Sequence, residues 1–232
     1  MRVTFPAFAQ MRQRGEDTRE SYLSGLALMA LAAFPVGAVL SGAAEPFVEA
    51  LFGQKWLPMI GVLQVLGVWA VARPLEHAIS WYLNSHERAG LVGRVALVLL
   101  PILALAIYLA ADRGGIETVA WVMVGHVAVS ATVLMTLVRR ELGVGVGRQL
   151  AVLAGPAAGA ATAWLAARGV AQLSADTPPA VSLVAAGLAG LAAYAIVVAL
   201  VAPGLVRDAR AKLKDALSRG DSGDEELPSA GG

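Results

Sequence analysis

The fold is decided by an apolar stretch at residues 57–83, which reads LPMIGVLQVLGVWAVARPLEHAISWYL. A helix rises about 1.5 Å per residue, so this stretch is long enough to cross the roughly 30 Å hydrocarbon core of a bilayer. Within it, Arg73, Glu76 and His77 lie within one helical turn of one another. A charge near the centre of a membrane helix costs about 2.5–3.5 kcal/mol on insertion scales. These groups therefore predict contact with protein or with a water-filled path, and they mark a functional site.

The composition extends this interpretation to the whole chain. Hydrophobic residues make up 57% of the 232 residues, charged residues make up 15%, and the mean hydropathy is +0.67. Soluble domains are roughly half apolar and about a quarter charged, so a polytopic membrane protein is indicated. Apolar stretches long enough to span lie at 20–43, 57–83, 90–111, 116–138, 149–170 and 180–203. We expect an all-α bundle of six transmembrane helices with no room for a soluble domain.

The basic residues predict the orientation of this bundle. Fourteen of the 18 Lys and Arg residues fall on one side, namely Arg2, Arg12, Arg14, Arg19, Arg88, Arg94, Arg139, Arg140, Arg148, Arg207, Arg210, Lys212, Lys214 and Arg219. The connections between spans on the other side carry only Lys55, Arg113 and Arg168, and Arg73 lies inside a span. Lys and Arg near span ends are retained on the cytoplasmic side, so both termini are predicted to be cytoplasmic.

The chain divides into five parts by composition. Residues 1–19 form a cytoplasmic N-terminal segment, residues 20–140 hold four spans, and residues 141–204 hold two more that are rich in Ala and Gly. The run from Gly155 to Gly159 offers a small-residue face for close helix packing. Apolar and basic residues alternate at helical spacing over 205–219, which predicts an amphipathic helix on the inner leaflet. The polar residues from 220 to 232 predict a disordered tail.

Polar and aromatic residues of the second span form a stripe along one side of the helix. At about 100° per residue the stripe contains the candidate substrate-binding residues Trp69, Arg73, Glu76, His77, Trp81 and Asn84, together with Ser80. Pro74 lacks an N–H, so the helix is expected to kink beside these residues. Arg73 offers a fork of donors to a phosphate or other anion, Glu76 tunes it, and His77 can exchange a proton.

Each of these residues also has a purely structural interpretation. Arg73 and Glu76 are spaced as an internal ion pair that serves only assembly. Trp69 and Trp81 suit either an interfacial belt or packing against a sugar ring. In the fourth span, His126 is the other ionisable group and a possible secondary site residue, for substrate or proton. A neutral His126 hydrogen-bonded to Ser130, one turn later, is the expected state.

Several chemistries are not indicated by the sequence. There is no Gly-rich phosphate loop, no paired-His metal spacing, no Gly-x-Ser-x-Gly elbow and no basic-aromatic surface for nucleic acid. Cysteine is absent, which removes thiolate ligands and nucleophiles. We expect a transporter rather than an enzyme, with no cofactor, no metal and no nucleic-acid partner. Passive, ion-coupled or gradient-coupled movement is favoured over an ATP-driven pump.

Several motifs together resemble a known family. These are Val3-Thr-Phe-Pro-Ala-Phe-Ala-Gln-Met-Arg12, Tyr22 and Pro35 in the first span, Leu51-Phe-Gly-Gln-Lys-Trp56, and Tyr82-Leu-Asn-Ser-His-Glu-Arg88. Over roughly residues 1–150 the chain resembles the second half of polysaccharide flippases. These belong to the superfamily of multidrug extruders and lipid-linked peptidoglycan precursor flippases. The last two spans match in hydropathy alone.

The resemblance implies two six-helix lobes, followed by two further helices, around a cavity that opens alternately to either face. It implies movement of undecaprenyl-diphosphate-linked oligosaccharides across the bacterial cytoplasmic membrane for O-antigen, lipopolysaccharide, capsule or exopolysaccharide assembly. Residues 20–140 would be the last four helices of the second lobe, and 141–204 the extra pair. Arg73 is the best match to the basic residues that bind the anionic substrate. The expected partners are that substrate, membrane lipids, and a missing N-terminal lobe or polysaccharide-assembly proteins.

Other functions stay open at the level of sequence. A chain of this extent is also consistent with a non-transporting membrane partner or a gene remnant, whose charges only secure packing. A transporter similar to the multidrug extruders is a further alternative. An intramembrane enzyme such as a polysaccharide polymerase is a weaker one, because no outer loop is long enough to build a catalytic site.

Overall fold

The computed structural model describes residues 18–85, 89–208 and 211, and this part of the chain is almost wholly helical. Its elements are α2 (Thr18–Gly42), α3 (Ala44–Phe52), the short 3₁₀ helix η1 (Gln54–Met59), α4 (Ile60–Ser85), α5 (Ala89–Leu142), α6 (Val146–Leu173) and α7 (Pro179–Val201). Six segments of the described part are long and apolar enough to cross a membrane. The prediction of an all-α bundle with six membrane helices is confirmed.

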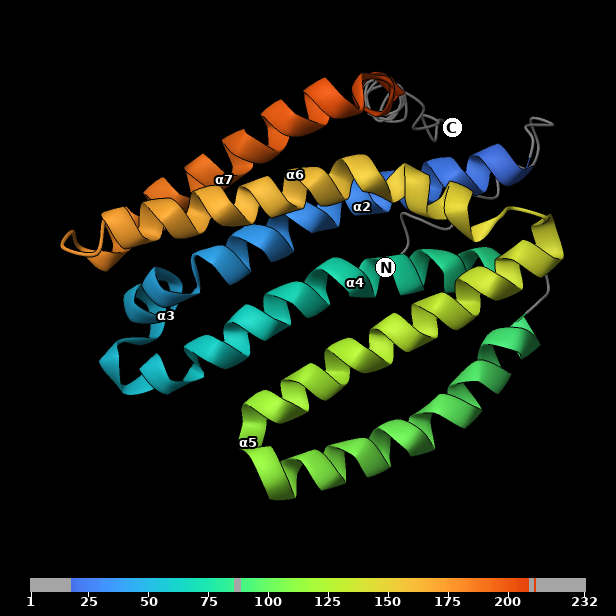
Figure 1. Ribbon diagram of the computed structural model, residues 1–232, viewed down its shortest axis with the longest axis horizontal. Coiled ribbons are helices and arrows are strands. Elements are labelled where there is room, and N and C mark those ends of the chain that lie inside the picture. Colours follow the sequence, from blue (N-terminus) through green and yellow to red (C-terminus); the bar gives the residue numbers. More distant parts are fainter. Residues whose placement is uncertain (1–17, 86–88, 209–210, 212–232) are drawn as a thin grey trace, which may run out of the picture.

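The α5 helix consists of two spans joined by a sharp turn. Gly115 has φ 67° and ψ −165°, a conformation that is not helical and that L side chains rarely adopt. The turn separates a first arm, Gly90–Asp112, from a second arm, Gly114–Leu142. Figure 1 shows the two arms folding back on each other as a hairpin. This tight turn lies between the predicted spans 90–111 and 116–138.

The helices lie side by side in the order α7, α6, α2, α4 and α5 (Figure 1). The closest neighbours along this row are α6 with α7, α6 with α2, α2 with α4, and α4 with α5. The α3 helix and η1 lie across the end of the row at which α2 ends and α4 begins, and α3 also packs against α7. The most apolar 18-residue stretch of the first arm of α5 contains no buried residue. That arm is therefore the most open helix of the row.

Glycine allows α2 and α4 to cross at close range. A Cβ built on Gly67 would lie 2.7 Å from the Gly37 carbonyl oxygen and 2.6 Å from Ser41 Cβ, so neither crossing glycine has room for a side chain. On the other side of the row, a Cβ on Gly159 would meet Val198 at 2.7 Å. Small residues thus set the helix spacing at both places, as in other membrane bundles. The packing face expected at Gly155–Gly159 is seen between α6 and α7.

Proline in α2 is accommodated by a hydrogen bond from α7. Pro35 has no N–H, so the Leu31 carbonyl lacks its usual partner one turn later. The Tyr194 hydroxyl, from a side chain only 6% exposed, donates to that carbonyl at 3.1 Å. A lone carbonyl in hydrocarbon is costly, so Tyr194 stabilises α2 and fixes α7 against it.

Gln149 joins α2 to the turn between α5 and α6. Its side chain is fully buried, accepts a hydrogen bond from the Tyr22 hydroxyl at 2.8 Å, and donates to the carbonyls of Met135 and Val144, each at 3.1 Å. A buried amide is tolerated in a membrane bundle only when its polar atoms are paired in this way. The three bonds hold that end of the bundle together.

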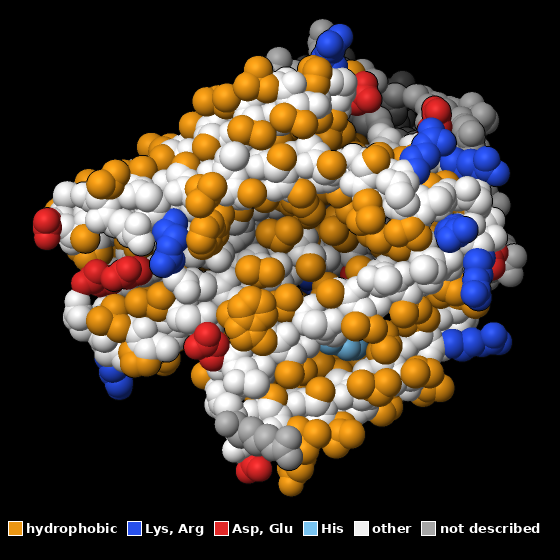
Figure 2. All heavy atoms as spheres, in the orientation of Figure 1, with side chains coloured by type: hydrophobic (Ala, Val, Ile, Leu, Met, Phe, Trp, Pro, Cys, Tyr) orange, Lys and Arg blue, Asp and Glu red, His pale blue; other side chains and the backbone are white. Residues whose placement is uncertain are grey.

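Charge is distributed unequally between the two ends of the row. Figure 2 shows Lys and Arg side chains gathered at the end where Figure 1 places the turn between α5 and α6 and the start of α2. Arg139 and Arg140 lie in the last turn of α5, and Arg148 lies in the first turns of α6. By the positive-inside rule this end faces the cytoplasm, which stays a prediction.

Several predicted segments lie outside the described residues. These are residues 1–17 of the N-terminal segment, Arg88, the tail at 220–232, and all of the predicted surface helix at 205–219 except 205–208 and 211. Residues 203–208 are helical after α7.

Candidate functional site between α4 and α5

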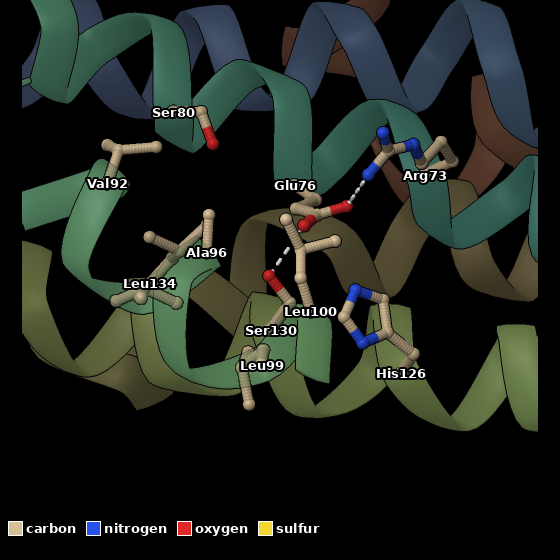
Figure 3. Close-up of a pocket in the computed structure, with 11 residues that line it drawn as sticks. Arg73, Glu76, Ser80, Val92, Ala96, Leu99, Leu100, His126, Ser130 and Leu134 are labelled. Atoms are coloured by element: carbon tan, nitrogen blue, oxygen red, sulfur yellow. Dashed lines mark hydrogen bonds and ion pairs between the residues drawn. The ribbon is translucent and has the colours of Figure 1, made fainter. Parts of the chain in front are cut away.

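Arg73 and Glu76, which we call the charged cluster, lie at the middle of α4, on the side that faces α5. Arg73 and Glu76 are three residues apart, so their side chains share one face of the helix. The Arg73 guanidinium donates through Nη1 to Glu76 Oε2 in a close ion pair (Figure 3). The Glu76 side chain is only 12% exposed, whereas the Arg73 side chain is 35% exposed. The carboxylate is thus enclosed, and the guanidinium keeps an open side.

Ser130 joins the second arm of α5 to this pair. Its hydroxyl donates to Glu76 Oε1 at 2.5 Å, and the serine itself is 4% exposed. Each carboxylate oxygen therefore has a different partner, one on α4 and one on α5. We expected Ser130 to bond to His126, and this expectation is wrong. Both residues face α4 from adjacent turns of one helix, and the carboxylate of Glu76 is a stronger acceptor for the hydroxyl than a neighbouring imidazole.

A cavity of about 180 Å³ adjoins the cluster. Its polar wall comes from α4 and from the second arm of α5, and its apolar wall comes from the first arm. The lining residues are Arg73, Glu76, Ser80, Val92, Val95, Ala96, Leu99, Leu100, His126, Ser130 and Leu134. Sites that enclose drug-sized ligands are larger, at roughly 300–1,000 Å³. The cavity in this form therefore has room for a phosphate group or a few waters, and not for an oligosaccharide.

His126 lines the same cavity from the second arm of α5. Figure 3 shows its ring pointing from that arm toward Arg73 and Glu76 on α4. The side chain is half-buried. The predicted secondary residue thus lies beside the predicted principal ones, although 53 residues separate Arg73 from His126.

The rest of the predicted stripe points elsewhere. His77 and Asn84 are exposed, Trp81 is 44% exposed, and none of the three lines the cavity. The His77 ring instead lies 6.5 Å from the Trp81 ring. The residues of the stripe cover about 140° of the helix at 100° per residue, which is wider than the face that α5 covers. The structure therefore divides the stripe, and only Arg73, Glu76 and Ser80 face the cavity.

Trp69 adjoins the site from one turn before Arg73. The Arg73 guanidinium carbon lies 5.8 Å from the centre of the Trp69 ring, which is within the range of a cation–π contact. The Trp69 indole Nε1 is buried and, within the described part of the chain, has no hydrogen-bond partner. Trp69 thus contacts the guanidinium from the preceding turn of α4, and its indole retains an unused donor.

Two hydroxyl groups that line the cavity lie outside the predicted set of binding residues. The sequence predicts Ser130 only as a partner of His126, and Ser80 only as a member of the polar stripe. Both lie one turn from an ionisable group, four residues after His126 and Glu76 respectively. That spacing is the signal that could have identified them. Among the described residues, no group of three or more His, Cys, Asp or Glu side chains is placed to hold a metal ion.

Comparisons with known proteins agree with the resemblance in the motifs. A family described as polysaccharide biosynthesis proteins matches residues 1–61. The chain is 32% identical over 121 residues to the teichuronic acid biosynthesis protein TuaB of Bacillus subtilis strain 168. It is 33% identical over 87 residues to the lipopolysaccharide biosynthesis protein WzxC of Escherichia coli K12. The resemblance to proteins of polysaccharide biosynthesis is thereby confirmed.

These matches cover a limited part of each protein. The TuaB match spans 52% of this chain and 25% of TuaB, and the WzxC match spans 38% of this chain and 18% of WzxC. The chain therefore corresponds to about a quarter or less of either relative. No solved structure matches the chain significantly.

Proposed function

We propose that this chain, which resembles polysaccharide biosynthesis proteins over part of its length, takes part in moving lipid-linked oligosaccharides across the bacterial cytoplasmic membrane. In this proposal the substrate is an undecaprenyl-diphosphate-linked unit and Arg73 binds its phosphate. The protein acts as a transporter rather than as an enzyme. The two relatives are named for teichuronic acid and lipopolysaccharide biosynthesis, which supports a surface polysaccharide as the final product.

The observation that carries the proposal is the position of the Arg73–Glu76–Ser130 cluster beside a cavity in the middle of a membrane helix. A guanidinium has five N–H donors in a planar fork, and the hydrogen bond to Glu76 uses one of its nitrogens. Phosphate oxygens fit the same fork as a carboxylate does. A phosphate that enters the cavity therefore meets a donor group that is already oriented by its contacts with Trp69 and Glu76.

Glu76 is the internal competitor of the phosphate in this mechanism. When the phosphate binds Arg73, Glu76 loses its ion pair but keeps the hydrogen bond from Ser130, so it is held back from the guanidinium. When the phosphate leaves, Glu76 pairs with Arg73 again. This exchange gives a site that binds an anion without holding it permanently, as a transporter requires. His126 faces both groups and provides a further donor for a phosphate oxygen.

The size of the cavity limits what this site encloses. At about 180 Å³ it accepts the phosphate part of the substrate and leaves no space for the sugars. The apolar wall, which the first arm of α5 provides, suits the lipid chain next to the diphosphate. We infer that the oligosaccharide passes outside this cavity.

Export in living cells tests the proposal. Cells that lack their own copy of the gene receive the natural full-length protein or its Arg73→Ala variant, and surface polysaccharide is measured together with the amount of protein in the membrane. Arg168→Ala is the matched control, because Arg168 also stacks on a tryptophan, at 5.6 Å, but does not line the cavity. We expect export to fall with Arg73→Ala and to persist with Arg168→Ala.

A second candidate is a membrane partner that does not transport. It is favoured by the fact that Arg73 and Glu76 already satisfy each other as an ion pair. In that case Arg73→Ala would lower the amount of protein in the membrane while export per molecule stayed constant. Undiminished export per molecule would overturn the transport role of Arg73.

A further inference from the structure

The segment between α2 and α4 carries apolar side chains that the transport proposal does not use. Phe47 lies 6.3 Å from Phe52, and Phe52 lies 6.3 Å from Trp56, measured between ring centres. Leu51 is 60% exposed, Phe52 is 51% exposed and Trp56 is 50% exposed. We call Phe47, Leu51, Phe52 and Trp56 the aromatic elbow. Large apolar side chains exposed together in this way mark a surface that is covered in the working protein.

The α3 helix has distinct polar and apolar sides. Ala44 and Val48 are buried, and the helix packs against α7. Phe47 and Leu51 are four residues apart and share one side of the helix, and Glu45 and Glu49 share another. Leu51 and Glu49 are about 160° apart around the helix axis at 100° per residue, whereas Phe52, seven residues after Glu45, lies about 20° from Glu45 and contacts Trp56 beyond the end of the helix. Gln54 donates to the Glu49 carboxylate and thereby holds η1 against α3.

Other exposed aromatic residues occur at the same end of the bundle. The Glu117 carboxylate packs against Gly61, because a Cβ added to Gly61 would lie 2.9 Å from Glu117 Oε2. The α5 hairpin is therefore level with the start of α4. Trp121, one turn beyond Glu117, is 53% exposed. Tyr108, in the first arm near the hairpin, is 74% exposed. Trp and Tyr gather in this way at the level of lipid headgroups, where their amphipathic rings are stable.

We propose that the aromatic elbow lies in the interfacial layer of the bilayer, in the leaflet at this end of the bundle. Its apolar side contacts the acyl chains next to the headgroups, and Glu45 and Glu49 face water. Short amphipathic segments with Trp, Phe and Leu on one side lie in the interface in this manner, buried by about 5–10 Å. The elbow is continuous with two membrane helices, α2 and α4, so it is held at that depth from both sides.

The elbow sets the depth of Arg73. Arg73 lies 13 residues after Ile60, the first residue of α4, which corresponds to about 20 Å along a helix. Half of the hydrocarbon core is about 15 Å. With the elbow at one interface, the charged cluster is near the centre of the bilayer. The binding site is thereby kept at a similar distance from both faces of the membrane.

Spin labelling in lipid vesicles tests this position. The natural chain has no cysteine, so Leu51→Cys, Trp56→Cys and Glu45→Cys each give a single labelling site. The purified variants are labelled and reconstituted into phosphatidylethanolamine–phosphatidylglycerol vesicles, and collisions with oxygen and with a water-soluble nickel complex are measured. We expect the labels at 51 and 56 to collide more often with oxygen than with nickel. The label at 45, on the polar side, should show the reverse preference.

Two other results overturn the proposal. If the labels at 51 and 56 collide with nickel as often as the label at 45, the elbow lies in water. If they are shielded from both reagents, another protein segment or a second copy of the chain covers them. Because these side chains are exposed, the substitutions should leave the fold intact, and elution of each variant at the natural volume in gel filtration confirms this. The outcome does not depend on the transport proposal.

Discussion

At the scale of single residues, the central feature is a carboxylate whose two oxygens bind side chains from two different helices. Glu76 binds Arg73 of its own helix through one oxygen and Ser130 of α5 through the other. A buried ion pair gives little net stability, because removing charges from water costs about as much as their attraction returns. The pair is therefore better explained by positioning than by stabilisation. It orients a guanidinium that retains access to the cavity.

The bond between Ser130 and Glu76 can be measured by a double-mutant cycle. Ser130→Ala and Glu76→Gln each weaken it, and the coupling energy between them should be about 1–1.5 kcal/mol. Hydrogen bonds between membrane helices average about 0.6 kcal/mol and reach about 1.7, and an ionised acceptor favours the upper part of that range. Unfolding of the purified protein in a denaturing detergent gives the free energies. Strictly additive effects would show that the two side chains do not interact.

The proposed competition between Glu76 and a bound anion for Arg73 can also be tested. In Glu76→Gln the competing charge is gone and the shape is nearly kept, so a polyprenyl diphosphate should bind more tightly than to the natural protein. Titration of the purified protein in detergent measures the affinity. Weaker binding would mean that Glu76 assists the anion rather than competing with it.

At the scale of elements, close contacts between helices define the row. The crossing of α2 and α4 depends on glycine at two positions, and the contact of α2 with α7 depends on Tyr194 beside Pro35. The first arm of α5, in contrast, forms one wall of the cavity while its outer side is open. The helices that carry the charged cluster are thus tightly packed on one side and loosely covered on the other.

The α2–α4 crossing should not accept a methyl group. Gly67→Ala places a Cβ within 2.8 Å of three atoms of α2, and overpacking of this kind costs typically about 1–3 kcal/mol. Gly187→Ala in α7 is the control, because nothing lies within 4 Å of its Cβ position. Thermal unfolding in detergent should show a lower midpoint for Gly67→Ala alone. Equal midpoints for both variants would argue against the close crossing.

The hydrogen bond from Tyr194 should matter only while Pro35 is present. Tyr194→Phe leaves the Leu31 carbonyl unpaired, at a cost of about 1 kcal/mol. In a Pro35→Ala background the new N–H of residue 35 can bond to that carbonyl, so Tyr194→Phe should then have little effect. Unfolding free energies of the four proteins check this. The same loss in both backgrounds would contradict the role assigned to Tyr194.

The sequence predicts the helices well and their mutual faces less well. Hydropathy identifies six spans, because each must be apolar over its whole length to cross a membrane. That uniformity removes the polar–apolar contrast that shows which side of a helix faces the core. The division of the predicted stripe into Arg73 and Glu76 on one side and His77 and Trp81 on another could not be read from spacing. The bond from Ser130 depends on the tertiary pairing of α4 with α5, which no local pattern specifies.

At the scale of the whole molecule, the uneven charge predicts the orientation in the membrane. Single cysteines at Gly145, in the turn between α5 and α6, and at Asp176, between α6 and α7, lie at exposed positions at opposite ends of α6. A membrane-impermeant maleimide should label Asp176→Cys in intact cells and Gly145→Cys only after the membrane is opened. The reverse pattern would invert the predicted topology.

The matches span a quarter or less of the length of the relatives. The residues of the proposed site, Arg73, Glu76, His126 and Ser130, all come from α4 and α5. An anion-binding assay on this chain therefore tests the proposed site directly.

The central claim is that Arg73 binds the phosphate of a lipid-linked substrate. The most direct measurement is the affinity of the purified natural protein and of its Arg73→Ala and Arg168→Ala variants for undecaprenyl diphosphate in detergent. Hydrogen bonds to charged groups contribute about 1.5–3 kcal/mol, so Arg73→Ala should weaken binding at least about tenfold. Arg168→Ala should leave it unchanged. Equal affinity of Arg73→Ala and the natural protein would contradict the account.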